Sequence, residues 1–477
     1  MGATFSTDCA AATVPFPHFW ELCVGSDHAP VALRADWQAQ LLRCRDDLGF
    51  RYVRFHGILS DDMGTLVNQN DRLVYSFYNA DTVFDFLVSA GMKPFVELSF
   101  MPLALSSGPD FVFRYKANVT PPRDYDQWGT LISKLVAHWV NRYGLEEVST
   151  WFFEVWNEPN LKAFWTGTQA DYFRLYEVTA RAIKAISPEL KVGGPATAAN
   201  GWIADFISFC EAHGVPNDFI STHHYPTDAF GKPGDDTETQ LAASRIGVLR
   251  EQAAAVRGQA AGRPVYYTEW STSSNSRDPL HDHPYAAAYA VKTILDMGDL
   301  VQGYSYWAFS DIFAENFFSS VPFHGGFGLM SIYGIPKPAY RAFEILHRLG
   351  GRMHPMQGAH ETVSAWMVSG EDRSTVVITN LALPRHPIAA ETVRIELENS
   401  PAWREAQVAR IDAGHANATA AWQAMASPGY PTQAQVAELI AQSELLWTPQ
   451  PVTSQDGTAS LAVEVQPQSV TAIELLR

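Results

Sequence analysis

The sequence has few cysteines and few positive charges for its length. Only four of its 477 residues are cysteine, and none of them lies in a Cys-x-x-Cys pair. That pattern indicates neither a zinc site nor a disulfide framework. The 34 lysines and arginines are outnumbered by 51 aspartates and glutamates, which gives a formal net charge of −17. We therefore expect no nucleic acid and no anionic membrane as partner.

Long apolar runs are also missing. No stretch approaches the roughly 20 apolar residues of a membrane span. The opening stretch, MGATFSTDCAAATVPF, has neither the basic start nor the continuous apolar segment of a secretory leader. Together with the scarcity of cysteine, these absences predict a cytoplasmic protein. The sequence leaves open whether copies of the chain form a homo-oligomer.

Apolar and aromatic residues are abundant, and up to about residue 345 they form short runs that alternate with helical patterns. The chain is 47% hydrophobic and contains 14 tryptophans, enough for a large core. Amphipathic helices are expected at 126–143 and 169–186. Eight strands are expected, at residues 18–24, 52–58, 93–100, 150–157, 191–196, 219–226, 264–271 and 302–310. Eight strand–helix units predict an α/β fold, the (β/α)8 or TIM barrel.

After residue 345 the pattern changes to strict alternation of apolar and polar residues. This alternation predicts a C-terminal antiparallel β-sandwich, so we divide the chain into a catalytic barrel, 1–345, and an accessory domain, 346–477. A partly helical insertion is expected near 413–445, with a helix at about 432–443. The accessory domain contains no catalytic constellation. Its expected role is structural, and a carbohydrate-binding module is the alternative.

Two of the predicted barrel strands end in a carboxylate. The run TWFFEVWNEPN, residues 150–160, is a buried strand that we expect Pro159 to stop, leaving Asn157 and Glu158 at its tip. The run at 264–273, PVYYTEWSTS, ends in the same way with Glu269. Active residues of such barrels lie at the carboxyl ends of strands. A facing pair of carboxylates is what glycosidic bond cleavage needs, whereas a helix cap or a surface glutamate is the alternative for each acid.

The two acids are expected to have different roles. The aromatic surroundings of Glu158 should raise its carboxyl pKa, which suits a general acid and base. Glu269 is expected to be the nucleophile, with charge supplied by Arg54 and hydrogen bonds by Tyr225 and Tyr267. If the pair works by double displacement, the carboxyl groups should lie ~5–5.5 Å apart, against ~6.5–9.5 Å in an inverting site.

Other polar and aromatic residues near the strand tips have more than one interpretation. Three histidines, His56, His223 and His224, suit sugar hydroxyls, a structural role or zinc, but they lack a HExxH or HxH spacing, so neither a metal nor a cofactor is expected. Trp307 suits a stacking floor or the core, and Glu315 suits a substrate hydroxyl or solvent. Three further predictions concern Glu97 in an internal polar network, His281 to His283 at the surface, and Phe111, Phe113 and Tyr115 as a pocket wall.

Several of these stretches together resemble glycoside hydrolase family 39, which includes β-xylosidases and α-L-iduronidases. The similar stretches are HFWELCVGSDHA, RFHGIL, FEVWNEPN, STHHY, YTEWS, SYWAFSDIF and PFHGGFGL, and they cover nearly the whole chain. The resemblance implies a retaining glycosidase with Glu158 as acid/base and Glu269 as nucleophile. It implies that Asn157 binds the sugar 2-hydroxyl. The residues implied to line the subsite of the non-reducing sugar are His56, His223, Tyr225, Trp307 and Glu315.

The same resemblance favours a neutral pentose as substrate. Iduronidase relatives place basic residues after the histidine of the sixth strand, where this chain has His224 and Tyr225. Xylosidase relatives carry two consecutive acids after the eighth strand, whereas here Ala314 precedes Glu315, which puts the strict sugar preference in doubt. The resemblance therefore implies an exo-β-1,4-xylosidase that acts on xylo-oligosaccharides. Alternatives are an α-L-arabinosidase or β-glucosidase, less readily an α-L-iduronidase, and, from another class, an inactive sugar-binding protein.

Overall fold

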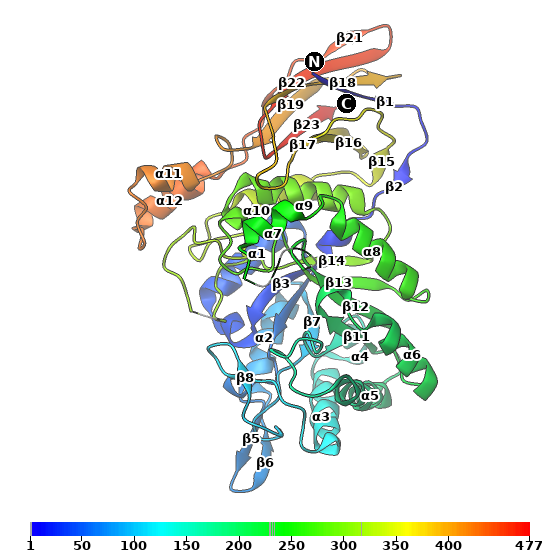
Figure 1. The fold of residues 1–477 in the computed structure, drawn as a ribbon, viewed down its shortest axis with the longest axis vertical. Helices are drawn as coiled ribbons and strands as arrows, with labels where there is room; N and C mark the ends of the chain where they lie inside the picture. The colour runs from blue at the N-terminus through cyan, green and yellow to red at the C-terminus, as the bar shows by residue number, and fades with distance from the viewer. Residues whose placement is uncertain (1, 229, 231, 233, 316) are drawn as a thin grey trace.

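The computed structural model describes residues 2–228, 230, 232, 234–315 and 317–477. Its centre is a closed barrel of eight parallel strands surrounded by helices, with a second β-rich part at one end (Figure 1). The barrel strands are β3 (Cys23–His28), β4 (Tyr52–His56), β7 (Lys93–Leu98), β10 (Phe152–Val155), β11 (Lys191–Thr197), β12 (Phe219–His224), β13 (Val265–Trp270) and β14 (Gly303–Tyr306). Each strand pairs with the next one along the chain and β14 closes onto β3, which confirms the (β/α)8 barrel.

The barrel begins later than expected. The predicted strand at 18–24 is wrong, because Phe19–Glu21 forms a 3-10 helix, η1, and the first barrel strand is Cys23–His28. Phe19 and Trp20 are nevertheless buried, at 4% and 0% exposure. A short apolar run is buried equally well in a 3-10 turn and in a strand, so hydrophobic periodicity alone cannot distinguish the two structures.

The strand that carries Glu158 ends earlier than the sequence suggested. β10 stops at Val155, so Pro159 is not what ends it. Trp156 and Glu158 take left-handed backbone angles, with φ of 72° and 44°. Side chains other than glycine adopt this region at a cost of order 1–3 kcal/mol, and such strain clusters at functional sites. The two kinks turn the chain out of the barrel wall while it still lies over the barrel mouth.

Helices cover the outside of the barrel. Those predicted at 126–143 and 169–186 are α3 and α5, and the expected stripe on α3 is buried, including Trp128, Leu131 and Trp139. Within the described residues, no helix combines the length and the apolar character needed to cross a membrane. The α-helices are α1 (Ala35–Leu48), α2 (Tyr78–Ser89), α3 (Tyr125–Tyr143), α4 (Leu145–Val148), α5 (Gln169–Ile186), α6 (Ile203–His213), α7 (Thr237–Ala243), α8 (Val248–Gln259), α9 (Pro284–Met297), α10 (Pro338–His347), α11 (Thr419–Ala424) and α12 (Gln433–Gln442).

Short elements decorate the loops between barrel strands. Two small hairpins, β5–β6 and β8–β9, lie in the loops after the second and third barrel strands. Their strands are β5 (Leu66–Gln69), β6 (Arg72–Tyr75), β8 (Phe111–Val112) and β9 (Ala117–Asn118). Further 3-10 helices are η2 (Ala29–Leu33), η3 (Asp61–Met63), η4 (Ala198–Asn200) and η5 (Pro279–Asp282).

The second part consists of two sheets around a separate apolar core, as predicted for the sandwich. One sheet has the order β1-β18-β22-β21 and the other β2-β15-β16-β17-β23-β19-β20. The strands are β1 (Ala3–Asp8), β2 (Val14–Pro15), β15 (Arg352–His354), β16 (Val363–Ser369), β17 (Arg373–Asn380), β18 (Glu391–Glu398), β19 (Glu405–Ile411), β20 (Thr448–Pro449), β21 (Thr453–Gln455), β22 (Thr458–Val465) and β23 (Ser469–Leu476). Helices α11 and α12 form the insertion expected near 413–445.

The start of the chain belongs to the second part rather than to the barrel. β1 pairs in parallel with β18, β2 pairs with β15, and both chain ends lie in this part (Figure 1). The division at residue 345 remains a proposal, to which the structure adds that residues 3–8 pair with 393–398. Across the junction, α9 packs against β17 and β23, and the indole of Trp366 donates to the carboxylate of Asp296 at 3.2 Å.

The two ends of the barrel differ in chemistry. At the amino ends of the strands, Phe95, Phe152 and Phe219 pack with Cys23 into an apolar plug. The rings of Phe95 and Phe152 stack with centroids 4.9 Å apart. Polar side chains in the barrel therefore gather toward the opposite end, where the carboxyl ends of the strands and the long loops leave room for a ligand.

Candidate active site

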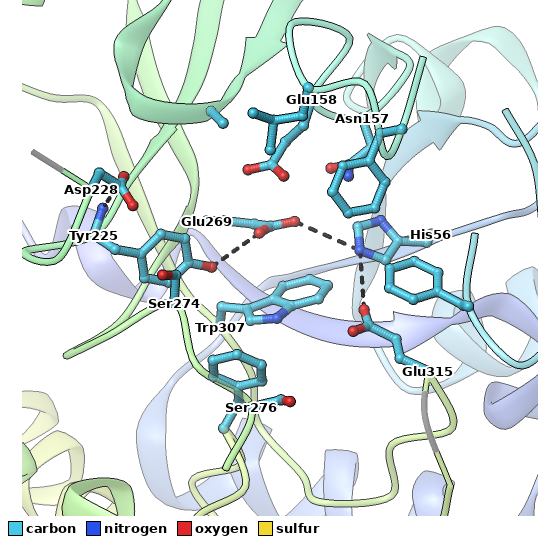
Figure 2. Close-up of a pocket in the computed structure, with 15 residues that line it drawn as sticks. His56, Asn157, Glu158, Tyr225, Asp228, Glu269, Ser274, Ser276, Trp307 and Glu315 are labelled. Atoms are coloured by element: carbon cyan, nitrogen blue, oxygen red, sulfur yellow. Dashed lines mark hydrogen bonds and ion pairs between the residues drawn. The ribbon is translucent and has the colours of Figure 1, made fainter. Parts of the chain in front are cut away.

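Seven of the eight residues predicted for the site line a single cavity of about 290 Å³ at the carboxyl ends of the strands (Figure 2). The seven are His56, Asn157, Glu158, Tyr225, Glu269, Trp307 and Glu315. They come from five of the eight barrel strands or from the loops that follow them, so barrel closure is what brings them together. His223 is the predicted residue that is not among the described lining residues.

Glu158 and Glu269 face each other across this cavity, 9% and 5% exposed. An oxygen of one carboxylate lies within 4.8 Å of an oxygen of the other. This approach agrees with the ~5–5.5 Å carboxyl separation of retaining glycosidases and is shorter than the ~6.5–9.5 Å of inverting ones. The geometry therefore suits direct attack by one carboxylate while the other handles the proton.

Glu269 is held by two donors. Nη1 of Arg54 donates to Oε1 at 2.7 Å, and the hydroxyl of Tyr225 donates to Oε2 at 3.0 Å. Both contacts stabilise negative charge on this carboxylate and fix its plane. The expected bond from Tyr267 is wrong, because that hydroxyl donates to Asn200 at 2.7 Å. The strand register shifts after Tyr267, so its side chain leaves the face that carries Glu269.

Arg54 is the buried hub of the site. Besides Glu269, its guanidinium bonds Glu154 at 2.6 Å and Glu97 at 2.8 Å, and it donates to the side-chain amide oxygen Oδ1 of Asn157 at 3.0 Å. Its side chain is fully buried. The internal polar network expected for Glu97 is thus confirmed. With these acceptors around it, Arg54 acts on substrate only through the side chains that it positions.

Burial sets the protonation of Glu158. Removal of its carboxyl from water raises the pKa to about 7, although His56 and Arg54 oppose the rise. Burial also lowers the pKa of the neighbouring His223 to about 4, so this imidazole is neutral near pH 7. A carboxyl with a pKa near 7 is able both to donate a proton and to take one back, as an acid/base residue must.

A hydrogen-bond chain behind Glu158 fixes where the proton lies. The hydroxyl of Thr268 donates its one hydrogen to Glu154 at 2.7 Å, so toward Nε2 of His223, at 3.1 Å, it accepts. Nε2 of the neutral imidazole therefore carries the hydrogen and Nδ1 is an acceptor. Oε1 of Glu158 lies 3.0 Å from that Nδ1. The network is satisfied when Glu158 is the protonated acid.

The far side of the cavity is closed by His56, Trp307 and Glu315. Nε2 of His56 lies 3.7 Å from Glu269 and 3.8 Å from Glu315, while its Nδ1 bonds Glu97 at 2.7 Å. Burial opposes charge on His56, but the Glu97 carboxylate prevails and raises its pKa. Burial also raises the pKa of Glu315, and the charge of Asp27 adds to the effect. These groups place hydrogen-bond donors and acceptors at that side of the cavity.

The three histidines weighed as a zinc site do not converge. His224 points away from the cavity, because consecutive side chains of a strand alternate in direction. Its Nε2 bonds the Tyr304 hydroxyl at 2.7 Å, and its ring stacks on Tyr267. Glu158, His223 and Glu269 have ligand atoms within 4.8 Å of one another, but His223 already bonds both Glu158 and Thr268.

The prediction that residues 281–283 lie at the surface is wrong for two of them. His281 and Asp282 are 2% and 7% exposed, while His283 is exposed. A carboxylate oxygen of Asp282 lies 2.7 Å from the ammonium of Lys337, which is itself fully buried. The local sequence gave no sign of this partner, because it lies 55 residues further along the chain.

Sequence reasoning missed part of the cavity wall. Asp228 follows the tip of β12, and Ser274 and Ser276 follow the tip of β13, so their place in the loops of the predicted barrel was the available signal. Of the three aromatic residues expected in a wall, Phe113 lines the cavity and Phe111 is 56% exposed. Tyr115 instead stacks on His28, with ring centroids 3.7 Å apart.

Known proteins with similar sequences and structures share this architecture. The family described as glycosyl hydrolases family 39 matches residues 5–458. A β-xylosidase of Caldicellulosiruptor saccharolyticus is 51% identical over 90% of this chain and 88% of its own length. A β-xylosidase of Geobacillus stearothermophilus is 35% identical over 96% of this chain and 93% of its own length. The crystal structure of a monomeric β-xylosidase from Caulobacter crescentus CB15 superposes with a TM-score of 0.87 at 36% identity, covering 99% of each chain.

Proposed function

This chain belongs to glycosyl hydrolases family 39 and is a glycoside hydrolase, and on that premise we propose that it is a retaining exo-β-1,4-xylosidase. Its substrates are xylo-oligosaccharides, from which it releases xylose at the non-reducing end. One observation carries the proposal: Glu158, whose buried carboxyl has a pKa raised to about 7, and Glu269, held by Arg54 and Tyr225, face one cavity with carboxylate oxygens within 4.8 Å.

The reaction has two steps on these residues. In the first, Glu158 gives its proton to the glycosidic oxygen while an oxygen of Glu269 attacks the anomeric carbon, so the leaving group departs and a glycosyl ester forms. In the second, the Glu158 carboxylate removes a proton from water, which attacks the same carbon and frees Glu269. Each step inverts the configuration of the anomeric carbon, so the product retains the configuration of the substrate. Arg54 and Tyr225 hold Glu269 in place for the attack.

The charge of the cavity supports a neutral sugar. No lysine or arginine is among the described residues that line it. The nearby Arg54 already contacts three carboxylates. The carboxylate of a uronic acid would therefore lie among several acids without a lysine or arginine to pair with, which is costly in a buried site. A pentose without a charged group avoids this cost.

The closed end of the cavity supports exo action. Trp307, His56 and Glu315 line the side beyond Glu269, and the ring of Phe113, from the long loop after β7, lies with its centroid 6.3 Å from that of His56. Nε2 of His56 and the carboxyl of Glu315 remain available for sugar hydroxyls. A single terminal sugar fits between these groups, whereas a continuing chain would meet them.

Paired azide rescue tests the roles of the two acids. We expect Glu269→Gly to lose turnover of an aryl β-xyloside and azide to restore it as α-xylosyl azide. Azide should rescue Glu158→Gly on a 2,4-dinitrophenyl xyloside as β-xylosyl azide, because the nucleophile is still present. A product of the other configuration in either case would refute the assignment. Parallel assays with aryl β-glucoside and α-L-arabinoside decide the sugar.

A further inference from the structure

The lining of the cavity divides into two halves on either side of the catalytic pair. His56, Trp307 and Glu315 form the closed half described above. Across Glu158 and Glu269 from them lie Asp228 and Ser274, on the side of Tyr225 (Figure 2). The terminal sugar occupies the closed half and Glu158 protonates the oxygen beyond it. The group that leaves must therefore pass over the second half.

Among the described residues that line this second half, Asp228 carries the carboxyl group. Its Oδ2 accepts the backbone N–H of Tyr225 at 2.8 Å, which fixes the orientation of the carboxyl. None of the hydrogen bonds among the described residues reaches Oδ1. The side chain is exposed and lines the cavity. Neighbouring protein atoms nevertheless remove part of its hydration and raise the carboxyl pKa to about 7.

The remaining wall of this half is suited to a sugar ring. Ser274, whose hydroxyl lies 3.1 Å from that of Thr227, ties the two loops beside Asp228 together. Leu161 and Ala198 supply apolar surface, and Leu161 is 39% exposed. A pyranose has an edge of hydroxyls and two faces of C–H groups, so it matches a wall with one fixed acceptor and an apolar side.

We propose that Asp228 selects the leaving group: its Oδ1 accepts a hydrogen bond from a hydroxyl of the second sugar while Leu161 packs against the ring. The inference rests on the proposed function and specifies the substrate class of the same site. It means that the enzyme prefers leaving groups that carry hydroxyls, such as a second xylose, over apolar aryl groups. Asp228 contributes to specificity and not to bond cleavage itself.

The test compares two substrates that differ only in the leaving group, xylobiose and 4-nitrophenyl β-xyloside. Asp228→Asn keeps a carbonyl oxygen for the Tyr225 N–H but loses the charge, and Asp228→Ala loses both. A hydrogen bond to a neutral carboxyl contributes about 1 kcal/mol and one to a carboxylate about 1.5–3 kcal/mol, so the ratio of kcat/KM for xylobiose to that for the aryl substrate should fall roughly 5- to 100-fold, most at a pH above the pKa of Asp228. The fall should be larger for Asp228→Ala.

The matched control is Asp71→Asn, which removes one negative charge at the exposed turn between β5 and β6. Its substrate ratio should equal that of the unaltered enzyme. An equal loss on both substrates in Asp228→Asn would overturn the inference, since Asp228 would then act only by holding Tyr225. An unchanged ratio would also overturn it. If the unaltered enzyme releases xylose from neither substrate, the proposed function itself fails, which is a distinct result.

Discussion

The Nδ1 atom of His223 lies 3.0 Å from Oε1 of Glu158, and the opposite nitrogen of the same ring lies 3.1 Å from the hydroxyl of Thr268. Thr268 immediately precedes Glu269 in β13. One strand therefore supplies both the proposed nucleophile and the group that orients the proton of the acid. Glu154 sets the donor-to-acceptor direction of this whole series of hydrogen bonds, because it accepts from Thr268 and is itself held by Arg54.

Thr268→Val should shift the basic limb of the pH profile to lower pH. Without the threonine hydroxyl, Nε2 of His223 loses its acceptor and the ring is free to carry its hydrogen on Nδ1. That hydrogen would stabilise ionised Glu158 in place of the acid, so the pKa of Glu158 should fall. A hydrogen bond of about 1 kcal/mol corresponds to a shift of nearly one pH unit. The measurement is kcat/KM for an aryl xyloside against pH.

Thr222→Val is the matched control for that shift. Thr222 lies on the neighbouring strand β12 and donates to the carbonyl oxygen of Thr197 at 2.9 Å, away from His223. The substitution has the same size and also breaks a buried hydrogen bond. It should lower the unfolding temperature without moving the basic limb. A basic limb that moves equally in both variants would show that general loosening of the barrel is the cause.

The pH profile of the unaltered enzyme should lose activity as pH rises through about 7. Burial raises the pKa of Glu158 from 4.5 to about 7, so the protonated acid is present below that pH and lost above it. The loss should be steep for phenyl β-xyloside, whose leaving group needs the proton. For 2,4-dinitrophenyl β-xyloside the basic limb should be weak, because that leaving group departs unprotonated. Identical limbs for both substrates would contradict the acid role.

The positions of Glu158 and Glu269 were predictable because they depend on local signals. An apolar run that ends in Asn-Glu-Pro and another that ends in Glu-Trp each place a carboxylate at the carboxyl end of a barrel strand. Eight short apolar runs with helical patterns between them are enough to predict that the strands close into a barrel. Closure then brings residues 158 and 269 together without further information.

Contacts set by backbone detail were not predictable in this way. The direction of Tyr267 depends on a register shift in β13, and the end of β10 depends on positive φ angles at Trp156 and Glu158. The burial of Asp282 depends on Lys337, a distant partner. The pairing of residues 3–8 with β18 joins chain segments almost 400 residues apart. No local pattern encodes these relationships.

Arg54→Lys should weaken both the barrel and the chemistry. Lysine keeps the charge but lacks the planar guanidinium, so it cannot donate hydrogen bonds to Glu97, Glu154 and Glu269 at the same time. Leaving a buried carboxylate unpaired costs about 3–5 kcal/mol. We expect a clear fall in unfolding temperature and a loss of kcat on an aryl xyloside. Arg142→Lys, which alters the exposed pair with Asp85, is the control and should change neither. Equal stability of the two variants would contradict the role of Arg54 as the hub.

Phe5→Ala tests whether the start of the chain stabilises the C-terminal sandwich. Phe5 is 4% exposed and packs in the core of the sandwich, on a strand that pairs with β18. Loss of a buried phenylalanine costs about 3–5 kcal/mol, so the unfolding temperature should fall by several degrees. Tyr430→Ala, at an 83% exposed position of the insertion, should leave the unfolding temperature nearly unchanged.

Calorimetry and residual activity of the Phe5→Ala protein should be followed together. If the barrel and the sandwich unfold as one unit through their α9 junction, both signals should fall at the same temperature. A Phe5→Ala protein as stable as the control would show that β1 is not an integral strand of the sandwich.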